Sequence, residues 1–249
     1  MQNDKYISTF TFEVEPFTED FTGHLSWSGL GNILLRSAQK HASARGFGFG
    51  ATSPEGLSWV FSRLIVECPV RPAAGQRFHV STWATEVRRQ FTIRLFRIYD
   101  ETGEALGHAY SVWALIDLTT RRPVDLTCTP AGDLRDVLLP APDFPIKGAS
   151  RISVNNPTNV TERIVHFSDL DMNRHLNSIR SLEIALDQIP FTRFEKGQCV
   201  RRIEMGYANE CFQGEKLSVR TEEAAPSEFH IEALRADGAC AFKAILNVE

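Results

Sequence analysis

The chain has 249 residues, and 43% of them are hydrophobic. This length is enough for one large domain or two small domains with a substantial core. The formal net charge of −4 at pH 7 argues against nucleic acid as the main partner, because binding phosphate requires a strong basic field.

The first half of the chain predicts one helix followed by a run of antiparallel strands, which is an α+β pattern. Residues 6–15 alternate as a strand does, and Ser26 is placed to cap a helix that carries apolar residues at helical spacing. The glycine-rich run 46–50 has no phosphate-loop spacing, so we interpret it as a close-packed turn. Strands are then expected at 57–67, 77–88, 90–100, 105–118 and 123–126.

The same order of elements follows again after residues 138–159, a proline-rich stretch that we interpret as a linker. A strand is expected at 160–165, and a helical stripe runs from Leu176 to Ile189, where Pro190 closes it. Four more strands are expected at 198–208, 215–222, 228–236 and 239–248.

The two halves align as copies of one unit. Asp20–Leu25 matches Asp171–Leu176 immediately before each long helix, and a second weak match falls at Gly75–Val80 and Gly214–Val219. Arg71-Pro72 then occupies the place that Glu210-Cys211 has in the second copy. We therefore predict a single active site, in the second copy.

Residues 169–177 hold a histidine, two carboxylates and two amides. Asp-x-Asp-x-Asn resembles the start of a calcium loop, but Arg174 stands where that loop requires glycine and Arg180 where it requires glutamate, so we predict no metal. Alone, such a cluster is more often a helix cap than a site. The joint occurrence of this cluster with Glu210-Cys211 favours an active site over a helix cap.

These residues carry a resemblance to a known family. Asp171-x-Asn173-x-His175 followed by Tyr207-x-x-Glu210-Cys211 is similar to the site of fatty acyl-acyl carrier protein thioesterases. The runs 46–50, 57–60, 111–113 and 120–122 also resemble this family. The resemblance implies two tandem hot-dog repeats, each a long helix wrapped by a curved antiparallel sheet, at 1–137 and 160–249.

The resemblance implies that Asp171, Asn173, His175, Glu210 and Cys211 all belong to the site, without a cofactor. Two mechanisms are open. In the first, Cys211 attacks as a thiolate with His175 as its base. In the second, Glu210 or Asp171 activates water while Asn173 and His175 position the reacting groups. We favour the second, because nothing in the sequence indicates a lowered pKa for Cys211.

The resemblance also places the acyl chain in the first repeat, whose own site is degenerate. Candidate lining residues are Trp59, Phe61, Leu30 and Leu34, although each of them is individually more typical of a core. The expected partner is acyl carrier protein, a strongly acidic protein that requires a basic receiving face. Among the candidate arginines, Arg174 and Arg180 lie nearest the predicted site.

The five cysteines form no CxxC pair, which favours reduced thiols in a cytoplasm and gives no zinc signature. No secretory signal and no membrane span are evident, and the start at the first strand resembles the bacterial members of the family, without the plant transit segment. A homodimer is left open. The alternatives are an acyl-CoA thioesterase of the hot-dog type, a dehydratase, or a non-catalytic acyl-thioester-binding protein.

Overall fold

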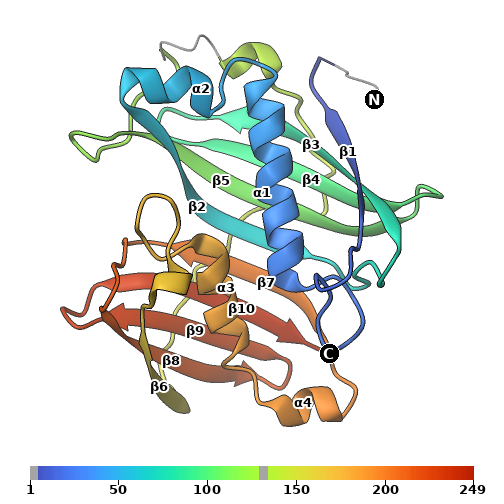
Figure 1. Cartoon of the computed structure of the whole chain (residues 1–249), viewed down its shortest axis with the longest axis vertical. Coiled ribbons are helices and arrows are strands. Elements are labelled where there is room, and N and C mark those ends of the chain that lie inside the picture. The colour runs from blue at the N-terminus through green and yellow to red at the C-terminus, as the bar shows by residue number, and fades with distance from the viewer. Residues whose placement is uncertain (1–4, 129–133) are drawn as a thin grey trace. The chain divides into compact units, whose positions relative to one another are not determined.

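The computed structural model describes residues 5–128 and 134–249. It is an α+β fold with a large antiparallel sheet and few helices (Figure 1). The chain divides into two compact units. The N-terminal unit comprises Met1–Ser62 and Val70–Gly148, and the C-terminal unit comprises Arg63–Pro69 and Ala149–Glu249.

The N-terminal unit is a helix on an antiparallel sheet whose strand order is β1-β3-β4-β5-β2. Its helices are α1 (Trp27–Ser43) and the short α2 (Phe49–Thr52), with 3-10 turns at Ser53–Glu55 and Leu134–Val137. Its strands are β1 (Ser8–Glu13), β2 (Leu57–Glu67), β3 (Arg77–Val87), β4 (Thr92–Asp100) and β5 (Ala105–Asp117). Helix α1 contacts β3 and β1 (Figure 1).

Helix α1 begins where the sequence predicts. The side chain of Ser26 caps it by accepting a hydrogen bond from the backbone N–H of Gly29 at 3.1 Å. Leu30 and Leu34 lie on the face that is turned to the sheet and are 0% and 1% exposed. The same face carries Ser37 and His41, so this part of the interior is not purely apolar.

The C-terminal unit repeats this plan with the strand order β7-β10-β9-β8-β6. Residues 63–67 of β2 pair with β7 inside this unit. Its strands are β6 (Asn159–Ile164), β7 (Val200–Tyr207), β8 (Lys216–Ala225), β9 (Glu228–Arg235) and β10 (Cys240–Val248). Its helices are α3 (Ser178–Leu186), which contacts β10, and the short α4 (Phe191–Glu195), with a 3-10 turn at Phe167–Asp169.

The predicted strands are confirmed to within a few residues, with two kinds of exception. The strand expected at 123–126 is wrong, because Pro123 makes only an isolated bridge to Ile116. The short helices α2 and α4 were not expected, since four or five residues show no readable periodicity.

The proline-rich stretch packs closely, with the Phe144 ring 5.9 Å from the Trp83 ring.

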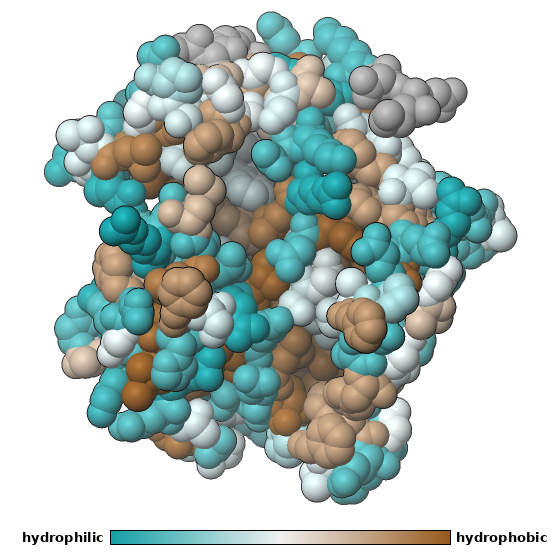
Figure 2. Space-filling view, in the orientation of Figure 1, coloured by the Kyte–Doolittle hydropathy of each residue, from teal (hydrophilic) through white to brown (hydrophobic). Residues whose placement is uncertain are grey.

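Apolar side chains remain at the surface among polar ones, as Figure 2 shows on one face. Several of the large exposed ones belong to the loops around residues 167–172 and 212, namely Phe167, Met172 and Phe212. Among the described residues, no helix combines the length and the apolar character that crossing a bilayer requires.

Replacing Leu34 by alanine should lower the free energy of unfolding by about 2–5 kcal/mol, because a buried side chain is lost and a cavity is left. Trp27, Trp59, Trp83 and Trp113 are the four tryptophans of the chain and all lie in the N-terminal unit, so tryptophan fluorescence during denaturation reports on this unit. The half-buried Leu35 provides the control, and Leu35→Ala should cost less. Equal losses of unfolding free energy in Leu34→Ala and Leu35→Ala would contradict the core position of Leu34.

Candidate active site

The predicted site loop is closed by its own backbone. The N–H of Asp171 donates to the carbonyl of His175 at 2.9 Å, and the N–H of Arg174 donates to the carbonyl of Asp171 at 3.0 Å. The Asp171 carboxylate accepts from the N–H of Asn173 at 2.8 Å. Arg174 adopts a positive φ of 65° at the tip of this turn. The loop is therefore a tight turn that presents His175 at its end.

One backbone hydrogen bond joins this loop to the second predicted motif. The N–H of Leu176 donates to the carbonyl of Cys211 at 2.8 Å. His175 precedes Leu176 and Glu210 precedes Cys211, so the bond brings the side chains of these two residues together. His175 Nδ1 lies 3.3 Å from Glu210 Oε1. The structure thus brings the two motifs together, although Glu210 and Cys211 lie in the loop after β7 and not on a strand.

The histidine and the glutamate are accessible, whereas the cysteine is not. The side chains of His175 and Glu210 are 21% and 41% exposed, and Cys211 is 1% exposed. Burial, with a further contribution from Glu215, raises the pKa of the Cys211 thiol to about 11. The thiolate that nucleophilic attack requires is therefore disfavoured near neutral pH.

His175 also has an aromatic neighbour that the sequence did not single out. The ring of Phe212 meets the His175 ring edge-on, with centroids 5.0 Å apart and planes at 90°. Such a contact restricts the orientation of the imidazole. Phe212 follows the matched cysteine directly, and its sequence position was the only signal that could have indicated it.

Asp169 is a fully buried carboxylate beneath the loop. It accepts from Arg163 Nη2 at 2.9 Å, from Arg180 Nη2 at 3.2 Å and from the N–H of His166 at 2.8 Å. Burial raises the pKa of Asp169, but the His166 N–H and the two arginines outweigh it, and the net shift is downward. Asp169 thereby holds the loop to β6, through Arg163, and to α3, through Arg180.

Helix α3 starts beside the site. The side chain of Asn177 caps it by accepting from the N–H of Ile179 at 2.7 Å. The buried hydroxyl of Tyr207 donates to the carbonyl of Ser178 at 3.0 Å. Asn173 and Arg174 are exposed at the loop surface, whereas Asp171 is half-buried and engaged in the turn.

The N-terminal unit contains the same loop with different chemistry. The N–H of Asp20 donates to the carbonyl of His24 at 2.9 Å, and the N–H of Leu25 donates to the carbonyl of Pro72 at 2.8 Å. These bonds match the register in which the two halves align. Arg71 occupies the place of Glu210, and its Nη1 lies 2.5 Å from Asp20 Oδ2. An arginine–aspartate pair thus replaces the histidine–glutamate pair.

The residues predicted for the acyl chain lie inside the N-terminal unit. Leu30 and Leu34 are buried, Trp59 Nε1 donates to the carbonyl of Phe47 at 2.7 Å, and the Phe61 ring lies 4.6 Å from that of Trp113. Their role in binding stays a prediction.

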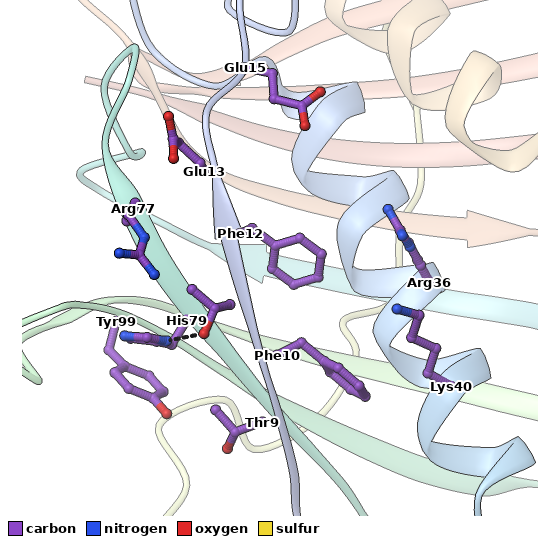
Figure 3. A pocket seen from close by; sticks show the side chains of 11 residues that line it. Thr9, Phe10, Phe12, Glu13, Glu15, Arg36, Lys40, Arg77, His79 and Tyr99 are labelled. Atoms are coloured by element: carbon purple, nitrogen blue, oxygen red, sulfur yellow. Dashed lines mark hydrogen bonds between the residues drawn. The ribbon is translucent and has the colours of Figure 1, made fainter. Parts of the chain in front are cut away.

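A groove of about 890 Å³ runs along β1 and α1 (Figure 3) and is lined by none of the predicted residues. Phe10 and Phe12 point from β1 towards α1, which contributes Arg36 and Lys40. The groove therefore lies apart from the predicted acyl-chain residues of the same unit.

Fold and site together define an α+β protein with a histidine–carboxylate pair at the start of a helix. The model of the acyl-ACP thioesterase N-terminal domain matches residues 5–129, and that of the C-terminal domain matches residues 153–244. The crystal structure of an acyl-ACP thioesterase from Bacteroides thetaiotaomicron is 37% identical, with a TM-score of 0.89 over 98% of each chain. The chain belongs to the acyl-ACP thioesterase family.

More distant relatives agree in fold or in part of the sequence. The 12:0-ACP thioesterase from Umbellularia californica shares the fold, with a TM-score of 0.85 at 20% identity over 98% of this chain and 97% of that one. The chloroplastic oleoyl-acyl carrier protein thioesterase 2 of Arabidopsis thaliana is 26% identical over 80% of this chain and 58% of its own length. The chain spans about half the length of the curated plant relatives that it matches.

Asp169→Asn should cost about 1.5–3 kcal/mol of unfolding free energy near neutral pH, because the buried carboxylate loses its charge-assisted hydrogen bonds while the two arginines stay partly solvated. The folded-state pKa of Asp169 is depressed, so this stabilisation is present above the unfolded pKa of about 3.9 and is lost as the pH falls through the folded value. The difference in unfolding free energy between this variant and the wild type should therefore become smaller in acid. Denaturant unfolding at a series of pH values measures it.

Glu183→Gln is the matched control, because Glu183 pairs with Arg180 from the partly exposed side of α3. It should cost no more than about 1 kcal/mol. An Asp169→Asn variant that is as stable as this control would contradict the anchoring role.

Proposed function

We propose that the chain is a thioester hydrolase that releases a free fatty acid from acyl carrier protein. The observation that carries the proposal is the accessible His175–Glu210 pair, 3.3 Å apart, in a chain of this family. A carboxylate next to an imidazole can accept a proton from water and can hold the imidazole in one tautomer.

In the reaction we infer, a water oxygen attacks the carbonyl carbon of the thioester. The water proton passes to the His175–Glu210 pair, the C–S bond breaks with its electron pair on sulfur, and the pair returns the proton to the leaving thiolate, which departs as the thiol. Asn173 and the backbone N–H groups at the start of α3, apart from that of Ile179, which donates to the Asn177 cap, are the proposed donors for the developing oxyanion. Asp171 keeps the turn closed, since its carboxylate accepts from the backbone of Asn173.

Cys211 is assigned a structural part in this proposal. Its carbonyl holds Leu176, its side chain is 1% exposed, and the pKa of its thiol is raised to about 11 by burial. These three features support attack by water over attack by sulfur.

The proposal includes a tandem hot-dog architecture. An N-terminal repeat over 1–137 would hold the acyl chain, a linker would span 138–159, and a catalytic repeat would span 160–249. The shared backbone pattern of the two loops supports the duplication. The half-buried Trp59 and Phe61 support the pocket, because they keep accessible surface in the N-terminal unit.

We further infer an acidic carrier protein as the partner, with the exposed Arg174 at the loop tip as part of the receiving face. The named relatives in the plant and bacterial comparisons support the carrier. A cytoplasmic location is proposed because none of the five cysteines, all of which are described, forms a disulfide. The bacterial assignment is proposed from the similarity to the Bacteroides structure. Association as a homodimer remains a prediction.

His175→Ala and Glu210→Gln should each lower kcat/KM for acyl carrier protein thioesters by about 10²- to 10⁴-fold, because proton transfer is lost. Cys211→Ala should stay within about tenfold of wild type, since only packing changes. A thiol-release assay over several chain lengths measures all three.

The control for folding is the circular dichroism spectrum of each variant. Full activity in both His175→Ala and Glu210→Gln would remove the proposed site. Abolished activity in a folded Cys211→Ala would restore the sulfur mechanism.

Added salt should lower kcat/KM for the carrier-protein substrate, because docking to an acidic partner depends on charge. The matched control is an acyl thioester of N-acetylcysteamine, which is small and uncharged and should respond weakly. Arg174→Asn keeps the positive φ accessible while removing the charge, and should reduce the salt response of the carrier substrate. Equal salt responses for both substrates would count against carrier docking.

A further inference from the structure

Strand β1 ends the sheet of the N-terminal unit, so one of its two edges has no partner strand. The sheet order begins at β1, which pairs with β3. Val14, which directly follows β1, bonds through both its N–H and its carbonyl to the residues just before β3. Because the direction of the backbone groups alternates along a strand, Thr9, Thr11 and Glu13 turn their N–H and carbonyl groups away from β3.

The sequence of β1 does not protect this edge. Residues Ser8–Glu13 alternate threonine and phenylalanine, contain no proline, and carry their one charge at the end of the strand. The pairing of β1 with β3 runs through all six residues without a bulge. Proteins commonly use proline, bulges or charges to keep an edge from pairing with a further strand. An edge that lacks them can accept an extended peptide.

A groove follows this edge. Residues Thr9–Glu13 all line the groove of about 890 Å³. Successive side chains of a strand lie on opposite faces of the sheet, so a groove that touches five consecutive residues follows the edge and not one face. Phe10 and Phe12 point from β1 towards α1, and both rings keep part of their surface accessible (Figure 3).

The α1 side of the groove is positively charged. Arg36 and Lys40 lie one turn apart on α1, are exposed, and line the groove (Figure 3). Lys40 Nζ lies 5.6 Å from the centre of the Phe10 ring. In the part of the chain that the structure describes, neither cation forms an ion pair with a carboxylate. The side chain of Glu13 shares the sheet face of Thr11, opposite to that of Phe12.

This charge favours an acidic occupant over a second copy of the chain. Two copies that paired their β1 edges about a two-fold axis would bring two sets of Arg36 and Lys40 to the same side of the joined sheet, where like charges repel. An added strand with carboxylates on that side would instead meet opposite charge.

We propose that the edge of β1 binds an extended acidic segment of a partner protein, which joins the sheet as a further strand. Backbone hydrogen bonds to Thr9, Thr11 and Glu13 would hold the segment in place. Glutamate side chains at alternate positions would lie on the Phe10 and Phe12 rings and reach the two cations of α1. The proposal goes beyond the proposed function and does not depend on it, because the groove contains no residue of the candidate active site.

The test titrates the protein into a fluorescently labelled short peptide of alternating threonine and glutamate and follows the anisotropy at low salt. This peptide should bind on the order of 10-fold more tightly than its counterpart with glutamine in place of glutamate, because two charge pairs are lost. Methylation of alternate backbone nitrogens blocks one edge of the peptide. One of the two alternate sets should abolish binding and the other should leave it intact.

A pair of substitutions at position 11 tests the backbone contact. Thr11→Pro removes an outward N–H and should abolish peptide binding, while the pairing with β3 is kept, because proline is tolerated where the N–H of an edge strand faces outward. Thr11→Val is the matched control and should bind as the wild type does. Both variants lose the hydrogen bond between Thr11 Oγ1 and His79 Nδ1, so its loss does not distinguish them.

A second set of variants tests the charge. Replacing Arg36 and Lys40 together by glutamine should abolish the preference for glutamate over glutamine in the peptide. Arg122→Gln is the control, since Arg122 is exposed after β5 and does not line the groove, and this variant should keep the preference.

Four results would overturn the proposal. They are equal binding of the glutamate and glutamine peptides, equal binding of the two methylated peptides, full binding by a folded Thr11→Pro, and a dimer of the wild type that Thr11→Pro dissociates. The last result would identify a second copy as the occupant. The peptide comparisons use the wild type alone, so they decide the matter even when Thr11→Pro folds poorly. A chain that binds as expected yet hydrolyses nothing would overturn only the hydrolase function.

Discussion

The candidate site depends on one backbone hydrogen bond, from the N–H of Leu176 to the carbonyl of Cys211. The bond joins the end of a tight turn to the loop after β7, two segments that are distant in sequence. Because the residues that precede its two partners are His175 and Glu210, their side chains meet 3.3 Å apart. The surrounding contacts maintain this bond: Asp171 closes the turn, and the buried Asp169 holds the turn to β6 and α3.

The N-terminal unit shows that this backbone arrangement does not require catalytic side chains. Leu25 and Pro72 form the equivalent bond, but Arg71 pairs with Asp20. The N–H of Ser26 donates to the carbonyl of Thr18, as the N–H of Asn177 donates to the carbonyl of Asp169 in the other unit. The loops of the two units thus share these backbone hydrogen bonds while their side chains differ.

Local signals in the sequence predicted most of the fold. The alternation of β1, the cap at Ser26 and the proline after α3 each act over a few residues, and the elements lie where these signals place them. The pairing of the two site motifs was predictable only through the aligned halves and the family resemblance. The burial of Cys211 and the arginines on Asp169 depend on contacts between distant residues, for which one sequence holds no signal.

The central claim is that water, activated by the His175–Glu210 pair, attacks the thioester without an acyl-cysteine intermediate. Intact-protein mass spectrometry of acid-quenched samples taken during turnover tests it most directly. The account predicts that the enzyme keeps its unmodified mass at every time point while free acid accumulates. An added acyl mass that maps to Cys211 and decays at the rate of turnover would contradict it.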